Sequence, residues 1–182
     1  MSELLLLQER VKNTIQLGES HFREFKSAFE GPQGNKKPRP TNRISADIGE
    51  ALVAFANADG GELLIGVEDN HKITGIPHSE GDIAQMLAAP KTHVHSDSDL
   101  PMTAAAELTI DGKVVLFFSV AKGTTEIYQL PDGRCVRRKD KSSMPERAER
   151  IIFDRQEVKS REFDRQFVDG ASVNDLDVSL VQ

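Results

Sequence analysis

The sequence predicts an α+β fold in which a mixed, mainly antiparallel sheet is flanked by helices. First, residues 44–69 combine a helical pattern, a glycine turn and a short apolar segment. Second, the apolar segments 104–110 and 113–120 are joined by Asp111-Gly112, a dipeptide typical of β-hairpins. Third, the three or four expected helices and six expected strands do not strictly alternate along the chain, which favours α+β.

Residues 44–69 supply the central helix and strand. Apolar residues recur at helical spacing at Ile44, Ile48, Ala51, Leu52 and Phe55. Gly60-Gly61 allows the positive φ that a sharp helix-to-strand reversal commonly needs. The apolar segment 63–67 contains only one interruption, Gly66, and predicts a central strand covered on both faces.

The segments before this unit predict a helix, a strand and a loop. Residues 3–17 carry leucine, valine and isoleucine at three- and four-residue steps, and Gly18 is a plausible stop. Residues 22–26 predict a short strand, with a helix as the alternative. Residues 30–43 hold three prolines and two glycines. They predict a loop whose length and basic content make it a functional candidate.

Residues 71–76 predict a second strand after a turn. The segment 79–89 predicts a helix, because Ser79 and Asp82 have the spacing of a capping box, and Pro90 is expected to end it.

A second hairpin is predicted from residues 127–130 and 134–138 around the turn at 131–133. Pro145 is expected to open a short helix towards Ile152.

The 182 residues suggest one domain with appendages. We expect an N-terminal helix at 1–17, the domain at 18–153, and a connector at 154–182 that leads to further domains of a longer protein. No stretch of eighteen apolar residues exists, so we expect no membrane span. The chain has one cysteine, Cys135, and no basic, cleavable leader, so the sequence fits a cytoplasmic protein.

The charge is unevenly distributed. The net charge is −6, which argues against a protein that coats nucleic acid over its whole surface. Two clusters of local charge +4 are nevertheless present, and their contact with phosphates is weighed against a role as solvated surface. The candidate nucleic-acid-binding residues are Lys36, Lys37, Arg39 and Arg43 in the first cluster, and Arg134, Arg137, Arg138, Lys139 and Lys141 in the second.

Several separated segments together resemble one family. They are GES…EFKSAF, ALVAFANADGGELLIGVED, TGI and YQLPDGRCVRRKDKS, within residues 18–150. They resemble the Schlafen-type Alba-like (Schlafen AlbA) domain found at the N-terminus of bacterial transcriptional regulators. The resemblance implies a mixed sheet flanked by helices that binds DNA or RNA. It also implies pairing as a homodimer, because animal relatives contain two related lobes.

The same resemblance implies a possible enzyme. Vertebrate Schlafen ribonucleases use three carboxylates, which match Glu19, Glu24 and Asp69 here, with Lys26 nearby. Such carboxylates would hold Mg²⁺ or Mn²⁺ to activate water. On one straight strand Glu19 and Glu24 would face opposite sides, whereas Glu24 and Lys26 would share a face. The alternative is structural: a Glu24–Lys26 pair, with Glu19 and Asp69 in caps or turns.

Other cofactor signals are weak. The chain has no phosphate-binding loop of the G-x-x-x-x-G-K-[ST] type, so nothing in it supports ATP binding. His93, His95, Asp97 and Asp99 occupy every second position of one segment, but we interpret this segment as a polar loop because no third metal ligand is identified.

The leading hypothesis is a nucleic-acid-binding module of a transcriptional regulator. The alternatives are a metal-dependent endoribonuclease and a protein-interaction or sensor domain. Convergence of the three carboxylates would favour the enzyme, and a common face for both basic clusters would favour the binding module.

Overall fold

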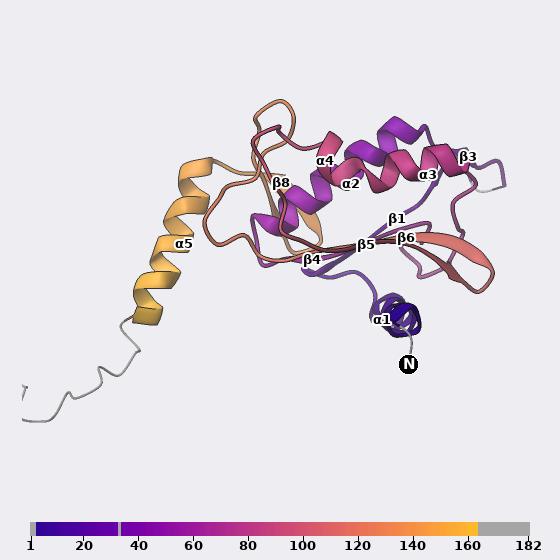
Figure 1. The fold of residues 1–182 in the computed structure, drawn as a ribbon, viewed down its shortest axis with the longest axis horizontal. Coiled ribbons are helices and arrows are strands. Elements are labelled where there is room, and N and C mark those ends of the chain that lie inside the picture. The colour runs from indigo at the N-terminus through magenta and orange to yellow at the C-terminus, as the bar shows by residue number, and fades with distance from the viewer. Residues whose placement is uncertain (1–2, 33, 164–182) are drawn as a thin grey trace, which may run out of the picture.

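A computed structural model describes residues 3–32 and 34–163 and shows a four-stranded sheet in the order β1-β4-β6-β5 (Figure 1). β1 and β4 are parallel, and the other two neighbouring pairs are antiparallel. The predicted α+β class with a mixed, mainly antiparallel sheet is therefore confirmed. The strands are β1 (Arg23–Lys26), β4 (Gly61–Ile65), β5 (Met102–Ile110) and β6 (Lys113–Val120).

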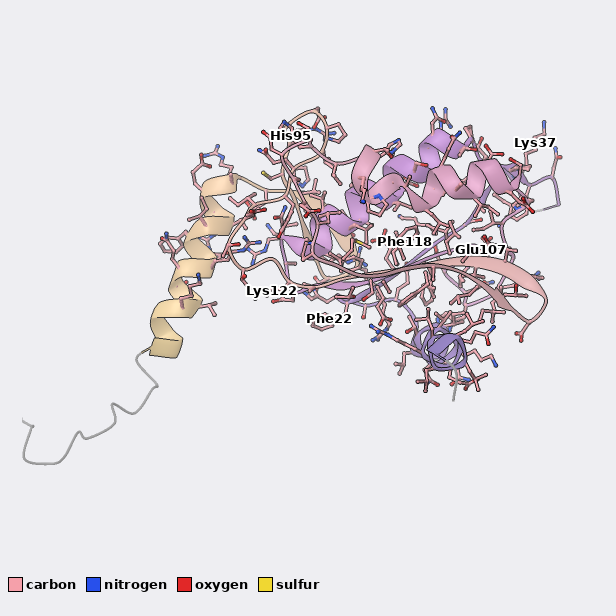
Figure 2. The ribbon with its side chains drawn as sticks, in the orientation of Figure 1. Phe22, Lys37, His95, Glu107, Phe118 and Lys122 are labelled. Atoms are coloured by element: carbon pink, nitrogen blue, oxygen red, sulfur yellow. The ribbon has the colours of Figure 1, made fainter. Side chains whose placement is uncertain are left out.

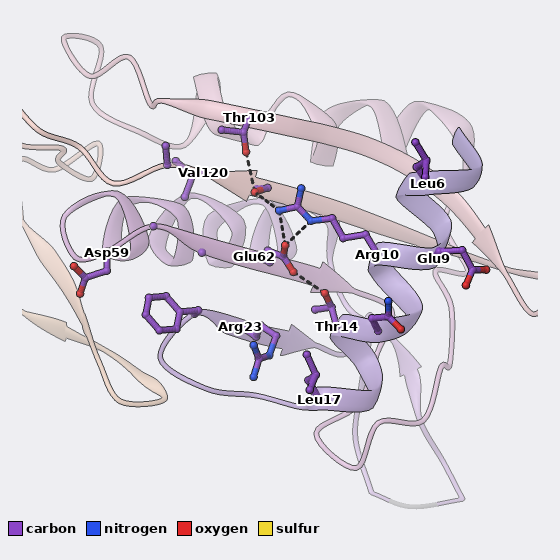
Figure 3. A pocket seen from close by; sticks show the side chains of 16 residues that line it. Leu6, Glu9, Arg10, Thr14, Leu17, Arg23, Asp59, Glu62, Thr103 and Val120 are labelled. Carbon is purple, nitrogen blue, oxygen red and sulfur yellow. Dashed lines mark hydrogen bonds and ion pairs between the residues drawn. The ribbon is translucent and has the colours of Figure 1, made fainter. Parts of the chain in front are cut away.

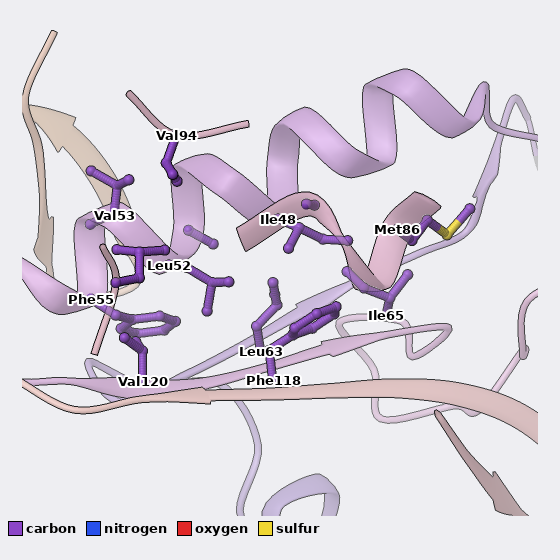
Figure 4. Close-up of a cluster of buried hydrophobic side chains, with 14 of the residues drawn as sticks. Ile48, Leu52, Val53, Phe55, Leu63, Ile65, Met86, Val94, Phe118 and Val120 are labelled. Carbon is purple, nitrogen blue, oxygen red and sulfur yellow. The ribbon is translucent and has the colours of Figure 1, made fainter. Parts of the chain in front are cut away.

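Helices cover both faces of the sheet. Figure 1 shows α2, α3 and α4 on one face and α1 on the other. Side chains alternate accordingly. Leu63 and Ile65 of β4 pack towards α2 (Figure 4). Leu64 packs in the separate cluster under α1. The prediction of a strand covered on both faces is confirmed. The helices are α1 (Glu3–Leu17), α2 (Thr41–Ala56), α3 (Glu80–Leu87) and α4 (Ala89–Thr92).

The parallel strands β1 and β4 are connected through α2, and the turn between α2 and β4 sets where the chain re-enters the sheet. Gly60 has φ +78°, as the glycine pair predicts, and its amide donates to the Phe55 carbonyl at 2.9 Å. Beside it, Asn57 is fully enclosed. Its amide group donates to the carbonyls of Tyr128 and Val136 and accepts from the Tyr128 amide. One side chain therefore anchors two distant segments to the end of α2.

One predicted hairpin is confirmed and the other is wrong. Asp111 and Gly112 both have positive φ between β5 and β6, as a two-residue hairpin turn requires. The second hairpin instead joins β7 (Val136–Lys139) to β8 (Ser142–Pro145). Residues 127–130 form no strand, because the backbone groups of Tyr128 and Val136 that would pair across the predicted hairpin bond the Asn57 side chain instead.

Three smaller expectations are also corrected. Residues 71–76 form only an isolated bridge between Val67 and Ile73, because the chain curves and two successive amides donate to the Gly66 carbonyl. The expected loop at 30–43 contains part of a short ribbon, β2 (Phe29–Glu30) with β3 (Lys37–Pro38), and α2 already begins at Thr41. Pro90 lies in the first turn of α4 rather than only ending α3, whose predicted capping box is present.

The last described element is α5 (Ala148–Phe163), which begins three residues after Pro145 and crosses the boundary expected at 153. The rest of the predicted connector lies outside the described residues, and the domain division stays a prediction. No helix in the described part of the chain is long and apolar enough to cross a membrane.

Two helical glycines allow a matched test of packing. A Cβ at Gly49 in α2 would lie 2.3 Å from the His93 carbonyl oxygen, whereas one at Gly81 in α3 would meet nothing closer than 3.9 Å. We expect Gly49→Ala to lower the free energy of unfolding by about 1–3 kcal/mol. Gly81→Ala should raise it by about 0.5–1 kcal/mol, because alanine favours the helix. Urea denaturation of both variants measures this, and equal effects would contradict the packing described.

Candidate nucleic-acid interface

A buried ion pair lies at the centre of the residues selected from the sequence. Glu24 of β1 and Arg138 of β7 are 5% and 2% exposed, and the Arg138 Nη1 donates to Glu24 Oε2. The Arg138 Nη2 donates to the carbonyls of Ser20 and Arg23 at 3.1 and 3.3 Å. Its guanidinium lies 4.9 Å from the centre of the Phe55 ring. Arg138 is therefore enclosed and has no free surface for a phosphate.

Lys26 completes the neutralisation of Glu24. Its Nζ lies 2.7 Å from Glu24 Oε1, on the face of β1 that the alternation of side chains predicts. Burial lowers the pKa of Lys26, but the carboxylates of Glu24, Asp47 and Glu19 together raise it by more, so the net pKa is above its ordinary value. Both oxygens of Glu24 are thus held by cations.

Glu19 satisfies a backbone amide on the outer edge of β1. Its Oε1 accepts a hydrogen bond from the Phe25 amide of β1 at 2.9 Å. Since Arg138 also bonds the Arg23 carbonyl, two side chains satisfy backbone groups on an edge that no strand among the described residues covers. Glu19, Glu24 and Arg138 form one structural network.

Asp69 lies apart from this network. It is exposed and lines a pocket of about 620 Å³ with Lys36 and Glu68, beyond the carboxyl end of β4. Within residues 3–32 and 34–163, no three His, Cys, Asp or Glu side chains are grouped so that they could hold a metal ion. Glu19, Glu24 and Asp69 therefore do not converge, and the condition set for the endoribonuclease hypothesis is not met.

Most of the predicted phosphate-binding cations already pair with carboxylates. Lys37 and Lys141 are the two of the nine that make no ion pair within the described residues, and both are exposed. The local charge of +4 in each cluster is largely neutralised by the fold. The pairs are Lys36–Glu68, Arg39–Asp47, Arg43–Glu30, Arg134–Asp132, Arg137–Asp154, Arg138–Glu24 and Lys139–Glu146.

The two basic segments border the same part of α2. Arg39 Nη2 lies 2.6 Å from Asp47 Oδ2, which attaches the segment 34–43 to α2. Asp47 also lines a small pocket of about 30 Å³ with Lys26 and Ser143 of β8. The contacts therefore bring the 34–43 segment and the β7–β8 hairpin to one surface, although the carboxylates of α2 lie between them.

Two residues with structural importance were not singled out from the sequence. Glu68 accepts hydrogen bonds from Lys36, Ser27 and Thr74 at 2.6–2.9 Å and so fixes the basic segment to the sheet. Asn57 belongs to the AFAN sequence but carried no role. Its position directly after an apolar helix could have suggested a buried capping side chain.

A groove of about 750 Å³ between α1 and the strands contains none of the predicted site residues (Figure 3). Arg10 Nε donates to Glu62 Oε1 at 2.7 Å, and Thr14 Oγ1 donates to Glu62 Oε2 at 2.6 Å. These polar groups satisfy one another within the groove.

Residues 19–147 match the family described as Schlafen, AlbA_2, which is most of the chain. The chain belongs to the Schlafen AlbA_2 family. The resemblance stated from the sequence is thus confirmed, and the matched region of this Schlafen AlbA_2 protein contains the entire four-stranded sheet. No curated protein sequence matches the chain significantly.

Two solved structures are similar to the Schlafen AlbA_2 chain. The DIP2311 protein from Corynebacterium diphtheriae has a TM-score of 0.59 and 20% identity, and the match covers 81% of this chain and 27% of that one. The chain thus spans about a quarter of that protein, and the likeness concerns the fold alone. The N-terminal domain of a RecG-related protein from Nitrosomonas europaea has a TM-score of 0.44 and 20% identity, with coverages of 71% and 81%.

Neighbouring arginines on opposite faces of β7 test the buried pair. Arg138→Ala leaves Glu24 enclosed with only Lys26, so we expect a loss of about 3–5 kcal/mol in unfolding free energy. Arg137→Ala removes a partly exposed partner of Asp154 and should cost about 1 kcal/mol or less. The double variant Glu24→Leu with Arg138→Met should be more stable than Arg138→Ala, because no unpaired charge stays enclosed. Similar urea midpoints for Arg137→Ala and Arg138→Ala would exclude this role.

Glu68 should contribute to the acid sensitivity of the domain. Burial raises its pKa, but hydrogen bonds from Lys36, Ser27 and Thr74 lower it by more, so the net pKa is below the ordinary 4.5. Stability from this group is present above about pH 4.5 and is lost as the pH falls through the folded-state pKa. Thermal denaturation of Glu68→Gln should therefore show a smaller loss on acidification than wild type. The exposed Glu107→Gln is the control, and an unchanged profile for Glu68→Gln would contradict the assignment.

Proposed function

We propose that this domain binds DNA or RNA through the phosphate backbone, with the surface bordered by segment 34–43 and the β7–β8 hairpin. The observation that carries the proposal concerns Lys37 and Lys141, which are exposed and make no ion pair among the described residues. Each lies in a segment that reaches Asp47 of α2: Arg39 pairs with Asp47, and Ser143 lines a small pocket with it. Family membership supports it, because the Schlafen AlbA resemblance implies nucleic-acid binding.

Phosphate contact of this kind is independent of base sequence. Lysine ammonium groups act as point charges that position a backbone without reading base edges. Lys139 is the next available cation, because it is exposed and would only have to exchange Glu146 for a phosphate. Arg137 and Arg138 are less available, because their side chains are largely or fully enclosed as well as paired.

The acidic residues of α2 limit how closely a backbone can approach. Asp47 and Glu50 line the small pocket between the two basic segments. Their negative charge repels phosphates, so a nucleic-acid strand would contact segment 34–43 and the β7–β8 hairpin without touching the α2 surface between them. We therefore expect modest affinity with a small number of ionic contacts.

Finer assignments stay predictions from the sequence. They comprise a role in a transcriptional regulator, a cytoplasmic location, a homodimer and a connector to further domains. No observation in the described residues favours the endoribonuclease, and a protein-interaction or sensor role becomes the conclusion if nucleic acid does not bind.

Fluorescence anisotropy with labelled single-stranded RNA and duplex DNA, over about 50–200 mM salt, tests the proposal. If Lys37, Lys141 and at most Lys139 contact phosphates, the slope of log K against log salt on duplex DNA should be about −2 to −3. A slope near about −8 would mean that all nine predicted cations are released from their partners.

The double variant Lys37→Gln with Lys141→Gln should move the slope by about 2 towards zero. Lys91→Gln, which changes an exposed lysine on α4, serves as the control and should bind as wild type. Absence of binding at low salt would overturn the proposal. Cleavage on a gel of samples with Mn²⁺, abolished by Glu24→Gln, would replace it with the enzyme.

A further inference from the structure

A small cationic pocket lies where α5 meets the turn after β6. Its volume is about 190 Å³, and its lining residues are Lys122, Gly123, Thr124, Arg155, Val158 and Lys159. Three of the six are cationic and none is acidic. Four other pockets serve for comparison: the three described above and one lined by α2 and the 130–134 turn. Each of these four contains at least one carboxylate. This pocket therefore differs in charge from those that the fold neutralises internally.

Backbone contacts hold the walls of the pocket in place. Arg155 donates to the carbonyl of Glu126 and, at 3.3 Å, to that of Ala56. The Gly123 amide donates to the same Ala56 carbonyl at 2.9 Å. A Cβ at Gly123 would lie 2.2 Å from the Tyr128 ring, so only glycine lets the turn approach this closely. The guanidinium and the turn are thus both fastened to the end of α2.

The positive charge of the pocket is incompletely compensated. The Arg155 Nε is buried and has no hydrogen-bond partner among the described residues. Burial lowers the pKa of Arg155, and the Arg137 cation lowers it further against the opposing effect of Tyr128. Asp154 does not neutralise the charge of Arg155, because it already pairs with both Arg137 and Arg150.

The two lysines at the pocket differ in their surroundings. Lys122 Nζ lies 2.8 Å from Asp59 Oδ1, and Asp59 is shared with His21. Lys159 is exposed and makes no ion pair within the described residues. An entering anion would therefore meet one free ammonium group, one that is already paired, and a fixed guanidinium.

We propose that this pocket binds a phosphate group, held by Lys122, Lys159 and Arg155 with the Thr124 hydroxyl. A phosphate has the size, the negative charge and the several acceptor oxygens that such a group of donors requires. Charge-assisted hydrogen bonds to a fixed guanidinium are among the stronger polar contacts in proteins.

The pocket is separate from the surface proposed for nucleic acid. Figure 2 shows Lys37 near the right-hand end of the molecule and Lys122 well to its left, beside the base of α5. Phosphate binding here does not depend on the function proposed above and would survive its failure. The phosphate could belong to a small phosphomonoester or to a nucleic-acid backbone, and the two sources are distinguished by experiment.

The test is a ligand titration of the full chain at constant ionic strength, monitored by the NMR chemical shifts of backbone amides. Inorganic phosphate should produce saturable shifts at Gly123, Thr124 and Val158, whereas chloride should not. A nucleoside monophosphate that shifts the same amides more strongly than an oligonucleotide without terminal phosphates would identify a small phosphomonoester. The reverse order would identify the backbone.

Matched lysine variants complete the test. Lys159→Gln and Lys122→Gln should each weaken phosphate binding by about three- to tenfold, because each removes one charged donor. Lys91→Gln, far from the pocket in sequence and exposed, should leave the affinity unchanged. Shifts that do not saturate, or equal affinities for all three variants and wild type, would overturn the proposal.

Discussion

The buried ion pair between Glu24 and Arg138 is the contact on which the arrangement of this domain depends. It joins the edge strand β1 to the β7–β8 hairpin across 114 residues of sequence. Enclosing two charges is costly, and the cost is offset here by Lys26, two backbone carbonyls and the face of Phe55. The hairpin makes no strand pairing with the four-stranded sheet, so side chains attach it to the rest of the domain. Arg138 bonds Glu24 and the backbone beside β1, the Asn57 amide bonds Val136, and Arg137 pairs with Asp154 of α5.

This constraint separates the residues that hold the fold from those that are available for binding. Glu19, Glu24 and Arg138 have the residue types expected of a catalytic or phosphate-binding site, but their charged groups are occupied in sealing β1 and fixing the hairpin. The hairpin then presents Lys139 and Lys141 on a fixed support. A Schlafen AlbA_2 domain built in this way offers few free cations, which suits a weak, sequence-independent contact with a polyanion.

The sequence predicted most local elements of the fold, but it did not predict which partners the charged side chains would bind or which of them would be buried. Helical periodicity predicted α1 and α2, a continuous apolar segment predicted β4, and Asp111-Gly112 predicted the hairpin of β5 and β6, because these signals are local. Val136 and Arg138 lie on the buried face of β7, but no local signal in the sequence tells which face of a strand will meet a partner 114 residues away. For the same reason the second hairpin was misassigned: Asn57 competes for its backbone groups from another element.

Native-state hydrogen exchange of the β7–β8 hairpin tests the central claim most directly. If the buried pair makes the hairpin part of the cooperative core, its hydrogen-bonded amides should exchange with an opening free energy close to that of β4 and β6. A local opening free energy for the hairpin amides that is several kcal/mol lower than that of β4 and β6 would contradict the claim. The β7–β8 hairpin would then be a loosely attached appendage, and Glu24 and Arg138 would not be what positions the candidate interface.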